Sequence, residues 1–123
     1  MKFKINKLSL LIFILTIFSH ITLKAQSVSC QELFEIVTEN YDNRDFVTPI
    51  GSSMLAKVTH YTVEGNGFVV AYIKSNQYDF TGKPYIFCGI SSQRWSSFKS
   101  EGMFGSWGES FHEYIRDYTC NCS

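Results

Sequence analysis

The N-terminal segment, residues 1–25, constrains this chain more than any other feature. A basic start precedes an apolar stretch over residues 8–23, and the small residue Ala25 follows. This order of charge, apolar run and small residue is typical of a secretory signal peptide. The run is short for a membrane span and is interrupted by Ser19 and His20, although an uncleaved signal anchor is the alternative. We therefore expect an exported protein, periplasmic or secreted, with no stable membrane span after cleavage.

Removal of this leader changes the net charge. Four of the eleven Lys and Arg residues lie in the leader and all eleven Asp and Glu residues follow it, so the mature part carries −4. A negative charge disfavours contact with a phosphate backbone, which makes nucleic acid a disfavoured partner. The mature part, about 98 residues long, is expected to form one domain with a small core.

Export gives the four cysteines a structural role. Disulfides form in oxidising compartments and stabilise small domains by about 2–4 kcal/mol each. Because Cys120 and Cys122 are separated by one residue, a bond between them is disfavoured. Two complete pairings then remain open, in which Cys30 and Cys88 each bond one of these two cysteines. In the alternative, Cys88 is a small buried hydrophobic residue, and Cys30 bonds Cys120 or Cys122 and leaves one thiol free.

Residues 26–46 predict an N-terminal helix and a connector. Ser29 and Glu32 have the spacing of a capping box, and an apolar stripe follows them, so we expect a helix over about residues 30–40. The turn-rich residues 40–51 predict a connector without regular structure.

Residues 47–123 predict an α+β domain with a cysteine-bearing tail. Runs of β-branched and aromatic residues predict three strands, over residues 54–63, 68–74 and 85–90. The stretch Glu64-Gly65-Asn66-Gly67 is a strong turn signal between the first two strands. Because the connections are short, the three strands are expected to form an antiparallel meander.

The C-terminal third of the chain predicts two helices. Ser91 or Ser92 can cap the first, which we expect to end at Gly102, and Ser106 can cap the second. The second helix has an apolar stripe with i, i+3, i+4, i+7 spacing, made of Phe111, Tyr114, Ile115 and Tyr118. The predicted fold class is thus α+β, a small antiparallel three-stranded meander covered by C-terminal helices, plus an N-terminal helix.

Several short segments occur in a familiar order, namely Ser52-Ser53-Met54-Leu55, Phe68–Tyr72, Tyr85-Ile86-Phe87, Ser100-Glu101-Gly102 and Ile115–Tyr118. In these segments the chain resembles the KTSC domain, a short domain found at the C-terminus of some lysyl-tRNA synthetases and as free-standing bacterial proteins. The likeness covers roughly residues 47–118. It departs from the family at Phe87, where a tyrosine is usual, and at Ser91, where a proline is usual. The resemblance implies RNA binding, which has been suggested for the family.

The sequence offers little catalytic chemistry. Its mature part has only two histidines, His60 and His112, and no Gly-x-Ser-x-Gly motif, so no nucleophile with a base is evident. Glu109 and His112 share one face of a predicted helix, but their spacing is not that of a structural zinc site, and a solvated surface is the simpler interpretation. We expect no enzyme activity, no metal and no cofactor. A minor envelope enzyme or a metal-binding protein is the second alternative.

The expected function is an exported, non-enzymatic binding or interaction module. Its partner is expected to be a protein, a peptide or an envelope polymer. Long loops beside a short sheet are where recognition usually occurs. The predicted binding residues are Tyr85, Phe87, Tyr78, Phe80, Lys83 and Arg116. The first alternative is a nucleic-acid (RNA) binding module, in which exposed aromatic residues stack on bases.

Overall fold

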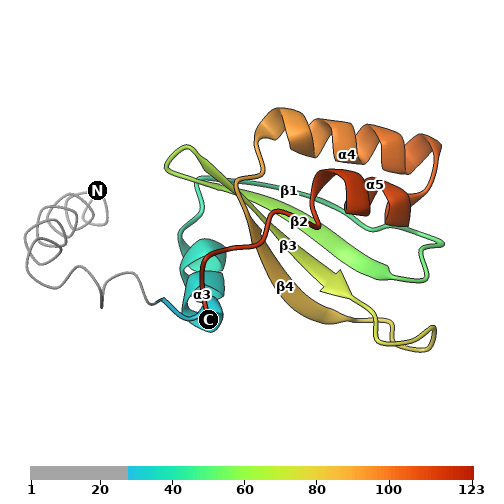
Figure 1. The fold of residues 1–123 in the computed structure, drawn as a ribbon, viewed down its shortest axis with the longest axis horizontal. Coiled ribbons are helices and arrows are strands. Elements are labelled where there is room, and N and C mark those ends of the chain that lie inside the picture. Colours follow the sequence, from blue (N-terminus) through green and yellow to red (C-terminus); the bar gives the residue numbers. More distant parts are fainter. Residues whose placement is uncertain (1–27) are drawn as a thin grey trace, which may run out of the picture. The chain divides into compact units, whose positions relative to one another are not determined.

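The computed structural model describes residues 28–123, so the predicted signal peptide lies outside the described residues. The described part is α+β, as predicted, with one four-stranded antiparallel sheet and three helices (Figure 1). None of these helices has the length and apolar character that a membrane crossing requires. The elements are α3 (Cys30–Asn40), β1 (Asn43–Val47), β2 (Leu55–Val63), β3 (Asn66–Ile73), β4 (Lys83–Cys88), α4 (Ser92–Phe104) and α5 (Trp107–Tyr114).

The sheet is a meander with the strand order β1-β2-β3-β4. Its first strand, β1, occupies the segment that the sequence predicted to be a connector, and it crosses the predicted boundary between residues 46 and 47. The expectation of three strands was therefore wrong. β1 pairs with β2 from Asn43 opposite Thr62 to Val47 opposite Val58. The backbone groups of β1 find their hydrogen-bond partners on β2, which is distant in the sequence, so the local turn residues could not indicate this strand.

Each face of the sheet has its own apolar cluster, because successive side chains of a strand point to opposite faces. Val69 belongs to the cluster beneath α4 and α5, where Trp95, Phe98 and Phe111 are buried. Val70, the next residue, packs on the other face with Val37 of α3. Figure 1 shows α4 and α5 together on one side of the sheet.

The two C-terminal helices have the predicted caps. The Ser91 hydroxyl accepts a hydrogen bond from the backbone N–H of Arg94 at 3.1 Å, and Ser106 caps α5 in the same way. Gly102 does not end α4, so that prediction was wrong. It lies inside the helix, where an added Cβ would lie 2.1 Å from the Trp107 ring. Gly102 instead permits close packing of α4 against α5.

The crossing from the sheet to α4 is fixed at Ile90. Its N–H donates to the carbonyl of Gly67 at 3.1 Å, and its carbonyl accepts from Nε2 of His60 at 2.7 Å. Only glycine fits at position 67, because an added Cβ would lie 1.8 Å from the Ile90 oxygen. The His60 ring stacks on Trp95 at 5.4 Å, and the Trp95 indole N–H donates to Asp45 at 2.7 Å. These contacts connect β1, β2 and β3 to α4.

All four cysteines are disulfide-bonded, which confirms the disulfide prediction. Cys88 bonds Cys120, and Cys30 and Cys122 are oxidised as well. The alternative of a buried, free Cys88 was therefore wrong. Next to the Cys88–Cys120 bond, Thr119 forms an antiparallel bridge with Phe87. The C-terminal tail thus covers one end of the edge strand β4.

We expect replacement of both Cys88 and Cys120 by serine to lower the free energy of unfolding by about 2–4 kcal/mol. The bond closes a loop of sequence separation 32 that carries both α4 and α5, so its loss gives the unfolded chain more freedom. Urea denaturation of the oxidised proteins measures the change. The conservative variant Thr119→Ser, which keeps the disulfide, is the control. A double variant as stable as the wild type would contradict this account.

Candidate ligand-binding groove

The short helix α3 covers only part of its face of the sheet. Beyond it lies a groove of about 290 Å³, lined by Thr48, Ala56, Lys57, Tyr72, Phe80 and Thr81. Lys57 and Tyr72 are partners on β2 and β3, and Tyr72 packs against the same cluster as Val37 of α3. The register of β2 shifts between Leu55 and Lys57, so Ala56 is an extra residue of β2 next to the pair of Lys57 and Tyr72.

One carboxylate holds the loop between β3 and β4, which borders the groove. Asp79 accepts hydrogen bonds from the backbone N–H groups of Ser75 at 3.0 Å, Gly82 at 3.0 Å and Thr81 at 3.3 Å. The hydroxyls of Ser75 and Thr81 donate to it too. These hydrogen bonds lower the pKa of Asp79 to about 2, and the bond from the Gly82 N–H has the largest effect. The loop therefore has a fixed conformation that a charged side chain maintains.

The fixed loop keeps two aromatic side chains in solvent. Tyr78 is 76% exposed and Phe80 is 81% exposed. Phe46, on β1, is 50% exposed, and the Lys57 ammonium lies 4.7 Å from its ring centroid. Exposed aromatic residues gathered beside a groove are typical of binding surfaces.

Two of the sequence-predicted binding residues belong to the opposite face of the sheet. Tyr85 and Phe87 pair with Ala71 and Val69, which belong to the cluster beneath α4 and α5. Tyr85 is 46% exposed, but Phe87 is only 7% exposed and meets Phe111 edge to face at 5.4 Å. The prediction of Phe87 as an exposed binding residue was wrong, because the alternation of β4 directs it into the core.

The other predicted residues lie at three places. Phe80 lines the groove, and Tyr78 lies in the same loop. Lys83 is exposed on β4 and pairs with Ile73 of β3. Arg116 follows α5 and bonds the His112 ring at 2.8 Å. The predicted residues thus do not form one site, and of the six only Phe80 lines the groove.

Sequence reasoning missed Lys57 and Tyr72, although a signal for them existed. The turn between β2 and β3 consists of Glu64 and Gly65, both with positive φ. Counting outward from this two-residue turn pairs Lys57 with Tyr72. No local signal indicated that Phe80, in a loop, would lie over that pair.

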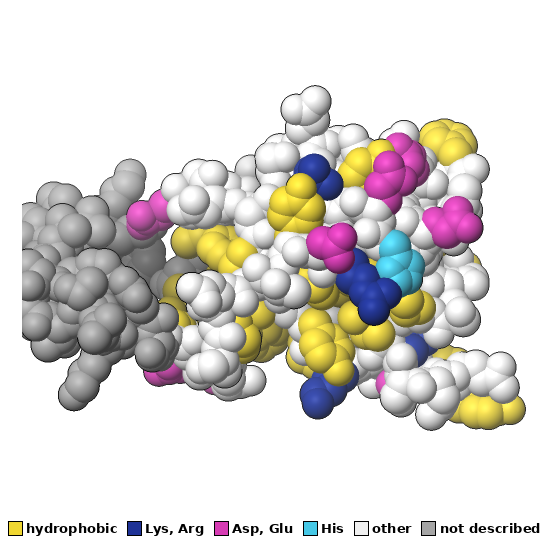
Figure 2. All heavy atoms as spheres, in the orientation of Figure 1, with side chains coloured by type: hydrophobic (Ala, Val, Ile, Leu, Met, Phe, Trp, Pro, Cys, Tyr) yellow, Lys and Arg dark blue, Asp and Glu magenta, His cyan; other side chains and the backbone are white. Residues whose placement is uncertain are grey.

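Charges of both signs are interspersed on the face that Figure 2 shows. Lys and Arg side chains lie next to Asp and Glu side chains there, and apolar side chains lie between them. One broad basic patch, the usual footprint of a nucleic-acid binding face, is not seen on this side of the molecule.

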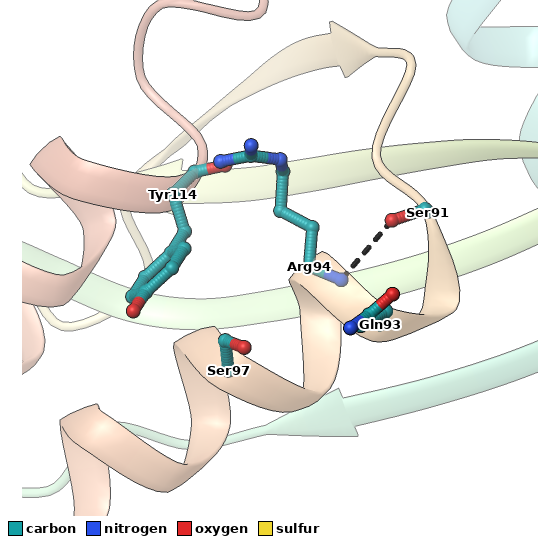
Figure 3. A pocket seen from close by; sticks show the side chains of 5 residues that line it. All are labelled: Ser91, Gln93, Arg94, Ser97 and Tyr114. Carbon is teal, nitrogen blue, oxygen red and sulfur yellow. Dashed lines mark hydrogen bonds between the residues drawn. The ribbon is translucent and has the colours of Figure 1, made fainter.

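A second pocket, of about 220 Å³, lies at the start of α4 (Figure 3). It is lined by Ser91, Gln93, Arg94, Ser97 and Tyr114. Arg94 donates to the Tyr114 carbonyl at 3.3 Å, and its guanidinium carbon lies 4.3 Å from the Tyr118 ring centroid. The lining itself contains no His, Asp or Glu. The arrangement connects α4 to the end of α5.

The cysteines and histidines of the described residues are all engaged in other contacts. Since every cysteine is in a disulfide, none supplies a thiolate nucleophile or a thiolate ligand. His60 bonds the Ile90 carbonyl, and His112 bonds Arg116. Within residues 28–123, no three His, Cys, Asp or Glu side chains are grouped so that they could hold a metal ion.

In comparisons with known proteins, no family model, no curated protein and no solved structure matched the chain. The resemblance to the KTSC domain therefore stays a prediction.

We expect Asp79→Ala to release the β3–β4 loop without unfolding the domain, because the carboxylate bonds only groups of that loop. Amide hydrogen exchange at Ser75, Thr81 and Gly82 should become about tenfold faster, while exchange in the strands stays unchanged. The exposed Asp117→Ala variant is the control. Equal exchange rates in the loops of Asp79→Ala and wild type would contradict the role of Asp79.

The pH dependence of the loop follows from the same carboxylate. The pKa of Asp79 in the folded state, about 2, lies below the usual value of 3.8 for an aspartate side chain. The loop bonds are therefore fully present above pH 3.8 and are lost as the pH falls through about 2. The carboxyl resonance of Asp79, followed by NMR during acidification, should show this midpoint.

Proposed function

We propose that this protein is an exported, non-enzymatic recognition domain that binds a protein, a peptide or an envelope polymer in the groove beside Phe80. The observation that carries this proposal is the exposure of Phe80 and Tyr78 on a loop that Asp79 holds in one conformation. A loose loop could fold such rings back onto the domain. A fixed loop keeps them available for a partner and reduces the loss of backbone conformational entropy on binding.

The oxidised cysteines support the exported location. Four disulfide-bonded cysteines in a domain of this size are typical of oxidising compartments. The signal peptide over residues 1–25 and the choice between periplasm and secretion belong to this proposal. A single cleavage near Ala25, found by mass spectrometry of the N-terminus, is the expected result.

The nucleic-acid alternative rests on the resemblance to the KTSC domain. Against it stand the mature charge of −4 and a groove whose lining contains a single cation, Lys57. A filter-binding assay with RNA over a series of salt concentrations separates the two functions. Retention that falls steeply with salt would favour RNA binding, and we expect no such retention.

We expect the double variant Tyr78→Ala, Phe80→Ala to lose a partner that the wild type retains. The tagged proteins are purified from the envelope fraction of cells that produce them, and the partner is quantified. Because aromatic residues dominate binding hot spots, the loss should be about tenfold or more. Both side chains are exposed, so the stability of the domain should not change.

Phe104→Ala is the matched control for this experiment. Phe104, at the end of α4, is 86% exposed and does not line the groove, so this variant should retain the partner. Loss of the partner from Phe104→Ala, together with full retention by the double variant, would place recognition elsewhere and contradict the proposal.

A further inference from the structure

We infer that the groove accepts a peptide segment in which an apolar or aromatic side chain stands beside a carboxylate. This inference rests on the proposed function of the groove and adds the chemical class of its ligand. Three observations carry it, namely the apolar walls, the single cation and the scarcity of polar groups in the lining.

The walls of the groove fit one large apolar side chain. The rings of Tyr72 and Phe80 and the methyl group of Ala56 lie on them. The volume, about 290 Å³, is at the small end of the range for ligand pockets. A single anchoring side chain from an extended partner matches this size, as in other modes of peptide recognition.

Lys57 sets the charge of the ligand. It is the only charged residue of the lining, and its ammonium lies against the Phe46 ring. Within residues 28–123, no carboxylate lies within 4.0 Å of this ammonium. A carboxylate beside the apolar side chain of the ligand would complement this charge, whereas a basic ligand would be repelled. The cation also prevents the groove from acting as an aromatic cage for a quaternary ammonium group.

The polar groups of the lining do not suit a sugar. A pyranose brings several hydroxyls, and each needs a partner when it leaves water. The lining contains no Asp, Glu, Asn or Gln, and the Thr81 hydroxyl already donates to Asp79. Thr48, Tyr72 and Lys57 remain, and they are too few for a ring of hydroxyl groups.

A nucleic acid is also a poor fit to this groove. Its bases could stack on Phe80 and Tyr78, but each phosphate brings a charge that Lys57 alone would have to neutralise. One cation beside an apolar groove instead matches one carboxylate beside one apolar side chain. An acidic and aromatic peptide segment is the ligand with that chemistry.

The test uses the whole mature protein and three capped pentapeptides that share a central phenylalanine. The flanking residues are two glutamates, two glutamines or two lysines. Binding is followed at low ionic strength through the amide resonances of Ala56, Lys57 and Thr81. We expect the glutamate peptide to bind about threefold tighter than the glutamine peptide and about tenfold tighter than the lysine peptide.

Charge reversal at Lys57 makes the test specific. Lys57→Glu should reverse the order of the three peptides, and Lys57→Gln should remove most of the difference between them. Lys83→Gln, which removes an exposed cation outside the groove, should keep the wild-type order. Thermal unfolding of each variant shows whether the fold is retained.

Two results would overturn the inference and leave the proposed function standing. One is tighter binding of chitohexaose than of the glutamate peptide at the same resonances, whereas tighter binding of a hexauridylate would contradict both the inference and the proposed function. The other is an unchanged order of the peptides in a folded Lys57→Glu protein. If no probe shifts these resonances at millimolar concentration, the inference is also wrong. The partner experiment with Tyr78 and Phe80 then decides separately whether the groove binds anything.

Discussion

The carbonyl and amide groups of Ile90 join the two layers of this fold. Ile90 exchanges hydrogen bonds with Gly67 on β3 and His60 on β2, directly after β4 leaves the sheet. Gly67 is required there because a side chain would collide with the Ile90 oxygen. The direction in which the chain leaves β4 is thereby fixed, and α4 and α5 must pack on the face that contains Val69.

This choice of face has a consequence for the other side of the sheet. Within residues 28–123, only α3 remains to cover it, and α3 has 11 residues, a length of about 16 Å. Val37 is its one fully buried side chain, and it packs against Tyr61 and Val70. The rest of that face stays open, so the side chains of Lys57 and Tyr72 line a groove there. The groove is thus a result of unequal coverage of the two faces, and the Asp79 loop supplies its outer wall.

The sequence predicted much of this fold but little of the groove. Periodicity, capping and turn residues act over a few positions, so α3, β2, β3, β4 and α4 could be predicted close to their observed bounds. The predicted stripe of the last helix extended to Tyr118, but α5 ends at Tyr114, so that part of the prediction was wrong. β1 could not, because it becomes a strand only through its partner β2. Phe87 was misplaced for a similar reason. The motif Tyr85-Ile86-Phe87 indicated a binding role for Phe87, but the face of the sheet to which Phe87 points depends on the register of β4 with β3.

The predicted site residues show which physical information a sequence lacks. Tyr78 and Phe80 were chosen because they are aromatic residues in a polar segment, and both are exposed beside the groove. The other residues of the groove, such as Lys57 and Tyr72, lie on β2 and β3. They are distant from Phe80 in the sequence and come close to it only when the sheet has formed. Lys57 in particular looks like an ordinary exposed strand residue until the face around it proves to be open.

The most direct test of recognition at the groove places a photo-crosslinking amino acid at position 80 or at position 104 of the full chain in living cells. Both positions are exposed in the free domain, at 81% and 86%, so accessibility alone does not distinguish them. If the groove beside Phe80 binds a partner, position 80 gives a specific covalent adduct and position 104 gives none. An adduct from position 104 with none from position 80 would contradict recognition at the groove.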